Sequence, residues 1–233
     1  MLGSKKSAFT MLELVMVIVV LGILAALAMP RIDRDIRQEA ANTILSTIRY
    51  TQHLALMDNK NDRTGAGLKE NLRENWQKGL WHLRFSSYDD GKKWFYTVSS
   101  SQDADANVDK KETALDPATG KYMYHLAGDA TLDEPDESPS IFIGEKFGIK
   151  SVDFTQCKGK IGASQSDNTA THIAFDYMGR PHKGIYGATN DYATVMHSDC
   201  TIRFEFEDND LQPLQLRVEK ETGYAYIVGE PNS

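Results

Sequence analysis

The stretch FTMLELVMVIVVLGILAALAM at residues 9–29 decides how the chain begins to fold. It is apolar except for one carboxylate, Glu13, close to its start. As an α-helix rising about 1.5 Å per residue it would be roughly 31 Å long, enough to cross the hydrocarbon core of a bilayer. The pattern therefore predicts a transmembrane or filament-core helix over residues 9–30, with Pro30 at its end.

The longer segment SAFTMLELVMVIVVLGILAALAMP, residues 7–30, resembles the class III leader and first helix of type IV pilins and pseudopilins. The resemblance implies that a prepilin peptidase cuts between Ala8 and Phe9 and methylates the new amino terminus of Phe9. It also implies that Glu13 pairs with the terminal amine of a neighbouring subunit, and that Pro30 is the proline that commonly kinks this helix. The family usually has glycine before the cut, where this chain has Ala8.

Physical chemistry gives Glu13 the same role. An ionised side chain inside a membrane costs about 2.5–3.5 kcal/mol, and less near the headgroups. A carboxylate and an ammonium buried together attract far more strongly than in water, whereas either one alone is penalised. We therefore interpret Glu13 as the residue that fixes the axial register between neighbouring helices. The alternative is a carboxylate that reaches the membrane surface without a partner.

A second interpretation of the same segment is an ordinary secretory signal. Ala26-Leu27-Ala28 fits the small-x-small rule, and Lys5 and Lys6 could form the basic region before the apolar run. The mature chain would then begin near Met29 as a soluble periplasmic binding or enzymatic domain. The apolar run is longer than the usual core of about 7–15 residues, and an acid inside such a core is unusual, so the pilin-like interpretation is preferred.

Composition favours an exported domain carried on this helix. The chain has 33 acidic against 26 basic residues and a formal net charge of −7. That balance opposes non-specific nucleic-acid binding, which needs a basic surface to release phosphate counterions. We divide the chain into a leader at 1–8, the helix at 9–30, an amphipathic helix at 31–57 and a β-rich domain with polar insertions at 58–233.

The segment from Ile32 to Met57 has helical periodicity. Apolar residues recur every four positions and, joined by Ala41, Leu45 and Ala55, predict a buried stripe: Ile32, Ile36, Ala40, Ile44 and Ile48. From Ile44 onward we expect this stripe to pack on its own domain. The polar turns from Arg31 to Glu39 are expected to project from the membrane and to contact neighbouring subunits.

Beyond a polar loop at 58–79, apolar residues recur at every second position. This alternation predicts antiparallel strands with one face on a core and the other in solvent. The first candidate alternates Trp81, Leu83 and Phe85 with His82 and Arg84. The other candidates are 94–98, 141–143, 152–154, 171–176, 200–206, 214–218 and a last strand that alternates at Tyr224, Tyr226 and Val228. The predicted fold class is α+β, with a long pilin-like amino-terminal helix packed on an antiparallel sheet.

Four short segments resemble the H-type minor pseudopilins of type II secretion and related minor pilins. They are RYTQHLALM at 49–57, WHLRF at 81–85, IAFDYMGRP at 173–181 and TGYAYI at 222–227. Relative to that group, the polar stretches at 58–79 and 99–140 would be insertions. Bulky loops pack poorly in a dense helical polymer, which favours a minor subunit over a major one.

The chain has two cysteines, Cys157 and Cys200. In an exported domain, an even pair predicts a disulfide. The alternative is two reduced, buried thiols. Metal binding by this pair is not expected, because the chain has no Cys-x-x-Cys or His-x-x-x-His spacing.

One acidic run looks like the beginning of a calcium loop, with Asp103, Asp105, Asn107 and Asp109 at alternate positions. Val108 and Ala114 stand where an EF-hand needs glycine and its bidentate glutamate, so we expect a solvated loop and no metal.

The chain lacks the Gly-x-Ser-x-Gly motif of hydrolases, the phosphate-binding loop, the His-Glu-x-x-His motif of zinc proteases and the dinucleotide-binding fingerprint. Its six histidines are scattered along the sequence. We therefore predict a structural subunit, not an enzyme, with no cofactor.

The predicted function is that of a minor subunit of a type II secretion pseudopilus. The first alternative is a minor pilin of a type IV pilus that serves assembly, adhesion or DNA uptake. The second is the periplasmic domain with an ordinary signal peptide. The expected partners are other pilin subunits, prepilin peptidase, the inner-membrane assembly platform and secreted substrate proteins, with no nucleic acid. The expected location is the bacterial inner membrane, single-pass with a periplasmic domain, or a surface filament.

Overall fold

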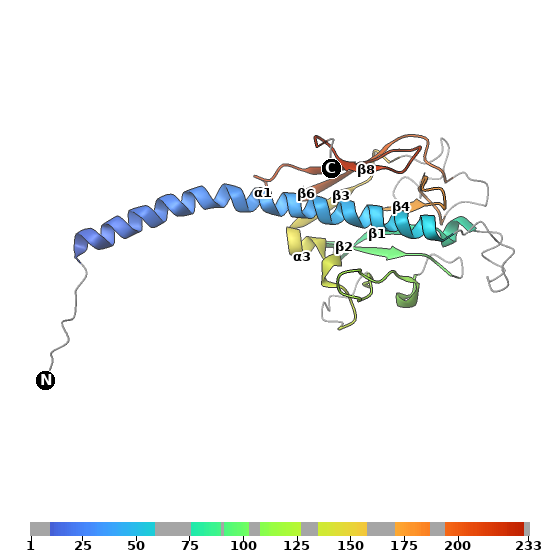
Figure 1. Cartoon of the computed structure of the whole chain (residues 1–233), viewed down its shortest axis with the longest axis horizontal. Helices are drawn as coiled ribbons and strands as arrows, with labels where there is room; N and C mark the ends of the chain where they lie inside the picture. Colours follow the sequence, from blue (N-terminus) through green and yellow to red (C-terminus); the bar gives the residue numbers. More distant parts are fainter. Residues whose placement is uncertain are drawn as a thin grey trace.

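α1 (Met11–Met57) is one continuous helix of 47 residues, and it continues through Pro30. Figure 1 shows it as a gently curved rod whose first half projects away from the rest of the molecule and whose second half lies along the domain. The computed structural model describes residues 10–58, 76–89, 91–102, 108–126, 135–157, 171–186 and 194–230, and for residues 25–35 it describes the backbone alone.

The two halves of α1 differ in what surrounds their side chains. From Met11 to Leu24 the large apolar side chains are exposed. In the second half, the predicted stripe lies in the core, and its fully or almost fully buried members are Ala40, Ala41, Ile44, Leu45, Ile48 and Ala55. The expectation that Ile44 and the residues after it pack on their own domain is confirmed.

No helix in the described part of the chain is both long and apolar enough to span a membrane. The predicted span over residues 9–30 includes Phe9 and the side chains of residues 25–30, which lie outside the described part.

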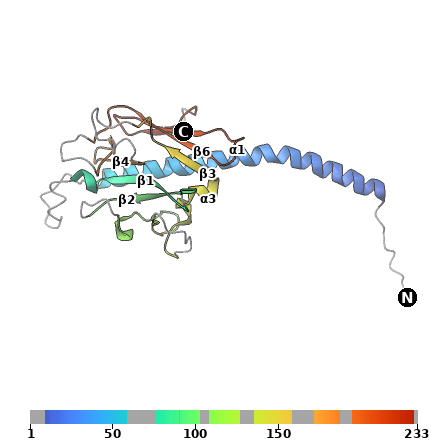
Figure 2. The same cartoon turned by 180° about the vertical axis from the view of Figure 1, so that it is seen from behind.

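Eight strands in the described part form two antiparallel sheets of four. The first sheet has the order β2-β1-β4-β5, with bounds Lys93–Ser99, Trp81–Tyr88, His172–Phe175 and Pro181–His182. The second has the order β3-β6-β7-β8, with bounds Ile149–Asp153, Cys200–Phe206, Leu214–Val218 and Ala225–Ile227. In Figures 1 and 2, α1 runs between β6 and β8 on one side and β1 and β2 on the other. The predicted α+β class, a long helix packed on antiparallel sheets, is confirmed.

Short helical segments fill the connections. They are η1 (Trp76–Gly79), η2 (Lys110–Glu112), η3 (Pro139–Ile141) and α3 (Ile143–Phe147). The predicted strand at 141–143 is therefore wrong, because this segment forms the end of η3 and the start of α3. Ile143 and Phe147, four residues apart, are both buried, and Gly148 ends α3 in the left-handed region at φ 67°. Gly144 lets α3 approach β2, since a Cβ there would lie 2.6 Å from the backbone nitrogen of Trp94.

The last strand faces the opposite way from the expected alternation. Ala225 and Ile227 are each 1% exposed, whereas Tyr224 is 46% and Val228 40% exposed. The reason is the register, in which Ile227 lies opposite Leu216 and Ala225 opposite Val218. Residues directly opposite in a sheet share a face, so the buried side of β7 selects the buried side of β8.

The start of β1 is covered on both faces. Leu83 and Phe85 are buried in the main core as expected, but His82 is fully buried as well. A smaller cluster covers the second face, and it consists of Trp76, Leu80, Ala174 and Ile185. The face that the sequence predicts to be solvated is therefore closed at His82 by segments distant along the chain, whereas Arg84 on the same face is exposed as expected.

The turns of α1 next to the domain bond to their own chain. Arg37 Nε donates to the Gln212 carbonyl at 3.1 Å, and Glu39 lies 2.9 Å from Lys146 Nζ. The expectation that the polar turns from Arg31 to Glu39 contact neighbouring subunits stays a prediction, and Arg37 and Glu39 also bond to the segments before β7 and β3 of their own chain. The side chains of residues 31–35 lie outside the described part.

Candidate functional site: the amino-terminal turn and the domain behind it

Glu13 sits in the first turn of α1, where it forms a capping box with Thr10. The backbone N–H of Glu13 donates to Thr10 Oγ1 at 3.3 Å, and the backbone N–H of Thr10 lies 3.4 Å from Glu13 Oε2. The Thr10 hydroxyl is a second donor to the same carboxylate oxygen, at 3.4 Å. This arrangement pairs helix N–H groups that would otherwise lack partners, and the positive end of the helix dipole favours the carboxylate.

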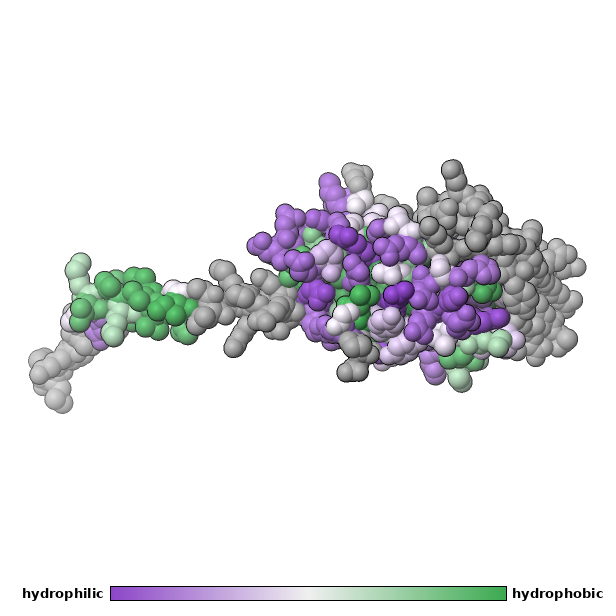
Figure 3. Space-filling view, turned by 90° about the horizontal axis from the view of Figure 1, so that it is seen from above, coloured by the Kyte–Doolittle hydropathy of each residue, from purple (hydrophilic) through white to green (hydrophobic). Residues whose placement is uncertain are grey.

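Apolar side chains surround this carboxylate on the helix surface. Glu13 shares one face of α1 with Met16, Val17, Val20 and Leu21. Figure 3 shows the described amino-terminal part as a mainly green, apolar region, in contrast to the purple surface of the domain. Within residues 10–24, Glu13 is the only ionisable side chain. The segment therefore presents one carboxylate on an otherwise apolar rod, a surface suited to apolar packing around a single specific charge contact.

Of the other residues predicted for processing and assembly, only Pro30 lies in the described part of the chain. Ala8 and Phe9, on either side of the expected cut, lie outside the described part, and Pro30 lies within α1 with only its backbone described. The roles of these residues and of Glu13 therefore stay predictions.

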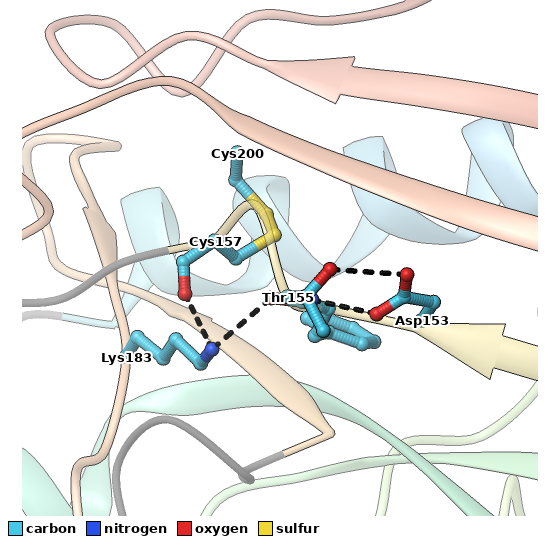
Figure 4. Close-up of a disulfide and its surroundings, with 6 residues drawn as sticks. Asp153, Thr155, Cys157, Lys183 and Cys200 are labelled. Carbon is cyan, nitrogen blue, oxygen red and sulfur yellow. Dashed lines mark hydrogen bonds between the residues drawn. A yellow bond between two sulfur atoms is a disulfide. The ribbon is translucent and has the colours of Figure 1, made fainter.

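The predicted disulfide is confirmed: Cys157 and Cys200 are bonded, and both are buried. Cys200 is the first residue of β6, and Cys157 follows β3, so the bond ties the end of one strand to the start of its neighbour (Figure 4). Asp153 shapes the connecting turn by accepting from the Thr155 N–H at 2.7 Å and from its hydroxyl at 3.0 Å.

A buried lysine from the other sheet reaches this turn. Lys183 follows β5 and is 2% exposed, and its ammonium donates to the carbonyl oxygens of Cys157 and Phe154 (Figure 4). The disulfide stays within the second sheet, whereas Lys183 links the first sheet to the same turn. The sequence gives no sign that Lys183 is buried, because it follows the polar stretch Arg180-Pro181-His182.

Histidines that look scattered in the sequence meet in the interior. The rings of His82, His172 and Tyr186 lie edge to face, with centroids 5.5–5.9 Å apart. His82 Nε2 lies 2.9 Å from the Tyr186 hydroxyl, and His172 Nε2 accepts from the Gly184 N–H at 3.2 Å. Burial lowers the pKa of His82 to about 4. Burial also holds the pKa of His172 well below its ordinary value, and His82 and Arg84 add to the effect.

A second buried group has the residue types of a hydrolytic triad. His182 Nδ1 lies 2.8 Å from Thr194 Oγ1, and its Nε2 lies 3.3 Å from Asp176 Oδ2. Asp176 and His182 are fully buried, and Thr194 is 3% exposed. Arg180 also engages Asp176, at 2.7 Å. Asp176 Oδ1 also accepts from the backbone N–H groups of Met178 and Arg180 at 2.9 Å each, so the group fixes the turn between β4 and β5.

The residues of the possible calcium loop are only partly described, since Asp103, Asp105 and Asn107 lie outside the described part. Asp109 precedes η2, and its backbone N–H donates to Glu112 Oε2 at 3.0 Å. Within the described residues, no group of three or more His, Cys, Asp or Glu could hold a metal ion.

Comparison with known proteins gives one match. Residues 3–29 match the model of the prokaryotic N-terminal methylation motif. Neither the curated proteins nor the solved structures contain a match to the chain. The matched range contains Ala8, Phe9 and Glu13, and it ends one residue before Pro30. The first helix thus carries the prokaryotic N-terminal methylation motif, which supports a type IV pilin-like subunit.

Proposed function

We propose that the chain is a minor subunit of a type IV filament-type machine, and that this machine is the type II secretion pseudopilus. In this proposal prepilin peptidase cuts between Ala8 and Phe9 and methylates Phe9. The subunit is then held in the bacterial inner membrane by α1, with its domain in the periplasm, until the assembly platform adds it to a filament.

The observation that carries the proposal is the capped Glu13 on the exposed apolar half of α1. The domain folds around the second half of the helix and leaves the first half with its large apolar side chains exposed. An apolar rod of this kind needs either lipid or other helices around it. With Glu13 as its only ionisable side chain between residues 10 and 24, the rod can select one axial position against a neighbour that presents an amine.

The events at Glu13 follow from its hydrogen bonds. Before assembly, the Thr10 N–H and hydroxyl are the donors to the carboxylate. During assembly, the methylated amine of Phe9 on a neighbouring subunit would become its counter-ion. An ammonium–carboxylate pair in a low-dielectric bundle is strongly favourable only when both charges are present and close together. The pairing would thus set the stagger of subunits along the filament.

The choice of a minor subunit of a secretion pseudopilus rests on the four short resemblances and on the polar stretches at 58–79 and 99–140. Deletion of the gene, followed by separate assays of exoprotein secretion and of surface piliation, tests it. We expect loss of secretion with piliation intact. Loss of piliation with normal secretion would instead favour a minor pilin of a type IV pilus.

A further inference from the structure

A pocket of about 220 Å³ opens beside α1, far from Glu13. It lies between the helix, β2, the connection from η2 to η3, and η3 itself. Its lining residues are Thr43, Ser46, Thr47, Tyr50, Tyr96, Asp116, Pro117, Met123 and Ser140. Nothing in the proposed filament role makes use of this pocket.

Asp116 contributes a carboxylate to the wall and is only 6% exposed. Its Oδ2 accepts from the hydroxyls of Ser138, Ser140 at 3.0 Å and Thr119 at 3.1 Å, and its Oδ1 accepts from the Ala118 N–H at 2.9 Å. Burial acts to raise the pKa of Asp116, but these hydrogen bonds outweigh it and leave the pKa below its ordinary value. The group is therefore a carboxylate at neutral pH.

Among the described residues, no Lys or Arg side chain forms an ion pair with this carboxylate. Each Lys or Arg side chain that forms an ion pair among the described residues bonds to an acid other than Asp116. The Asp116 carboxylate also lies near the phenols of Tyr50 and Tyr96, whose pKa values it helps to raise. A nearly buried anion without a counter-ion beside an open pocket attracts cations more strongly than an exposed acid does, because the surrounding protein screens it less.

Three hydroxyls on the α1 wall of the pocket donate their hydrogens to carbonyl oxygens of the protein itself. The Ser46 and Thr47 hydroxyls donate to the Thr43 carbonyl at 2.8 and 2.9 Å. The Tyr50 hydroxyl donates to the Leu115 carbonyl at 2.9 Å. These three hydroxyls still offer oxygen lone pairs, and together with the Asp116 carboxylate they favour a ligand that donates hydrogen bonds.

The remaining walls are apolar. Pro117, Met123, the threonine methyl groups and the rings of Tyr50 and Tyr96 provide carbon surface around the single carboxylate. A long aliphatic stem that ends in a donor-only cation matches this combination, because lysine and arginine bury their stems on apolar surface while the charged head finds an acceptor. Arginine fits better than lysine, since its guanidinium is less strongly hydrated and stacks on aromatic rings.

We propose that the pocket lined by Asp116, Tyr50 and Met123 binds the arginine side chain of a partner protein that docks against α1. The side chain would enter with its stem along Met123 and Pro117 and its guanidinium toward the carboxylate. This proposal does not depend on which filament the chain joins.

The test uses the full chain in detergent micelles, with ¹³C-labelled methionine methyl groups observed by NMR. Met123 reports on the pocket, while Met178 and Met196 lie outside its lining and serve as internal references. The probes are arginine capped at both ends as amides, citrulline capped in the same way, and the guanidinium ion alone. We expect capped arginine to shift Met123 saturably in the millimolar range, at a concentration at least tenfold below that needed for either other probe.

Three results would overturn the proposal. If capped citrulline bound as tightly as capped arginine, the positive charge would have no role in binding. If the guanidinium ion bound as tightly as capped arginine, the pocket would be a site for small cations and not for a protein side chain. Equal shifts at Met178 and Met123 would indicate non-specific binding.

Two variants separate the pocket from the fold. Ser46→Phe, at an exposed helix position, should fill the pocket and abolish the Met123 shift, whereas Asn42→Phe, one turn away and also exposed, should leave it unchanged. Asp116→Asn should abolish binding as well, with an unchanged Met196 resonance as the check on folding. Retained binding in both Ser46→Phe and Asp116→Asn would contradict the assignment.

Discussion

Gln52 on α1 donates a hydrogen bond from Nε2 to the carbonyl oxygen of Gly179, at 2.9 Å. The same amide nitrogen donates to the Thr222 carbonyl at 2.8 Å. Gly179 belongs to the β4–β5 turn of the first sheet, and Thr222 to the β7–β8 turn of the second. One helical side chain thus fastens a turn of each sheet to α1, at the end of the helix opposite Glu13.

The close contact of these turns predicts a large cost for Gly223→Ala. Gly223 has φ +68°, and a Cβ there would lie 2.6 Å from Gln52 Nε2 and closer still to the Gly179 carbonyl. Gly120→Ala is the matched control, because Gly120 has φ +69° with nothing within 4 Å of the added Cβ. Urea unfolding should give a loss of about 1 kcal/mol for the control, from backbone strain alone, and of about 3 kcal/mol or more for Gly223→Ala. Equal losses would mean that the turns are free to separate.

Removal of the disulfide should weaken the domain without changing its fold. The bond closes a loop with a sequence separation of 43 residues. The chain-entropy model gives a loss of roughly 4 kcal/mol for a loop of this size. We expect Cys157→Ser with Cys200→Ser to lower the urea midpoint accordingly, and mild reduction of the native protein to do the same. An unchanged midpoint would show that Lys183 and the strand pairing hold this turn without the bond.

The buried histidines predict loss of stability under mild acid. The folded-state pKa of His82 is about 4 and that of an unfolded histidine about 6.5, so the unfolded chain binds the proton first. Burial of neutral His82 thus contributes to the free energy of unfolding in full above pH 6.5. This contribution falls as the pH drops from 6.5 toward 4, and the loss over that range is about 3 kcal/mol. Burial of His172 acts in the same direction. Unfolding free energies at pH 7 and pH 5 should differ less in His82→Gln than in the native protein, and identical differences would remove His82 from the effect.

Glu13→Ala should separate membrane anchoring from filament assembly. The variant should insert into membranes at least as well as the native chain, because it removes a charge from the apolar run. It should nevertheless fail to crosslink to partner pilins, since the amine of Phe9 on a neighbour would be buried without its counter-charge, at a cost of several kcal/mol. Leader removal should persist. Normal crosslinking together with normal secretion or piliation would mean that Glu13 does not set the register.

The mature protein is expected to begin at N-methylated Phe9. This expectation rests on the resemblance to type IV pilins, carried by the small residue Ala8 before the cut, Phe9 after it and Glu13 four positions later. Mass spectrometry of the amino-terminal peptide from native membranes measures this directly. A mature chain that starts at Met29 would instead support an ordinary signal peptide and contradict the pilin-like assignment.

The sequence by itself determined the features that are local along the chain. The apolar run with its single acid, the stripe on the second half of α1 and the alternation of β6 and β7 each depend on the spacing of neighbouring residues. For the same reason, the methylation motif at residues 3–29 can be read from one contiguous segment. With only two cysteines, the partner of Cys157 was also determined once the pair was taken to be oxidised.

Only the tertiary structure decided which of these local surfaces became interior. His82 is buried because Trp76 and Ile185 cover the far side of its sheet, and β8 faces inward at Ala225 because its register follows Val218. The pocket at Asp116 likewise requires α1 and β2 to meet the loops around η3, across more than 70 residues of sequence between Thr43 and Asp116. Burial depends on what lies opposite a residue in space, and spacing along the chain carries no information about a partner that distant.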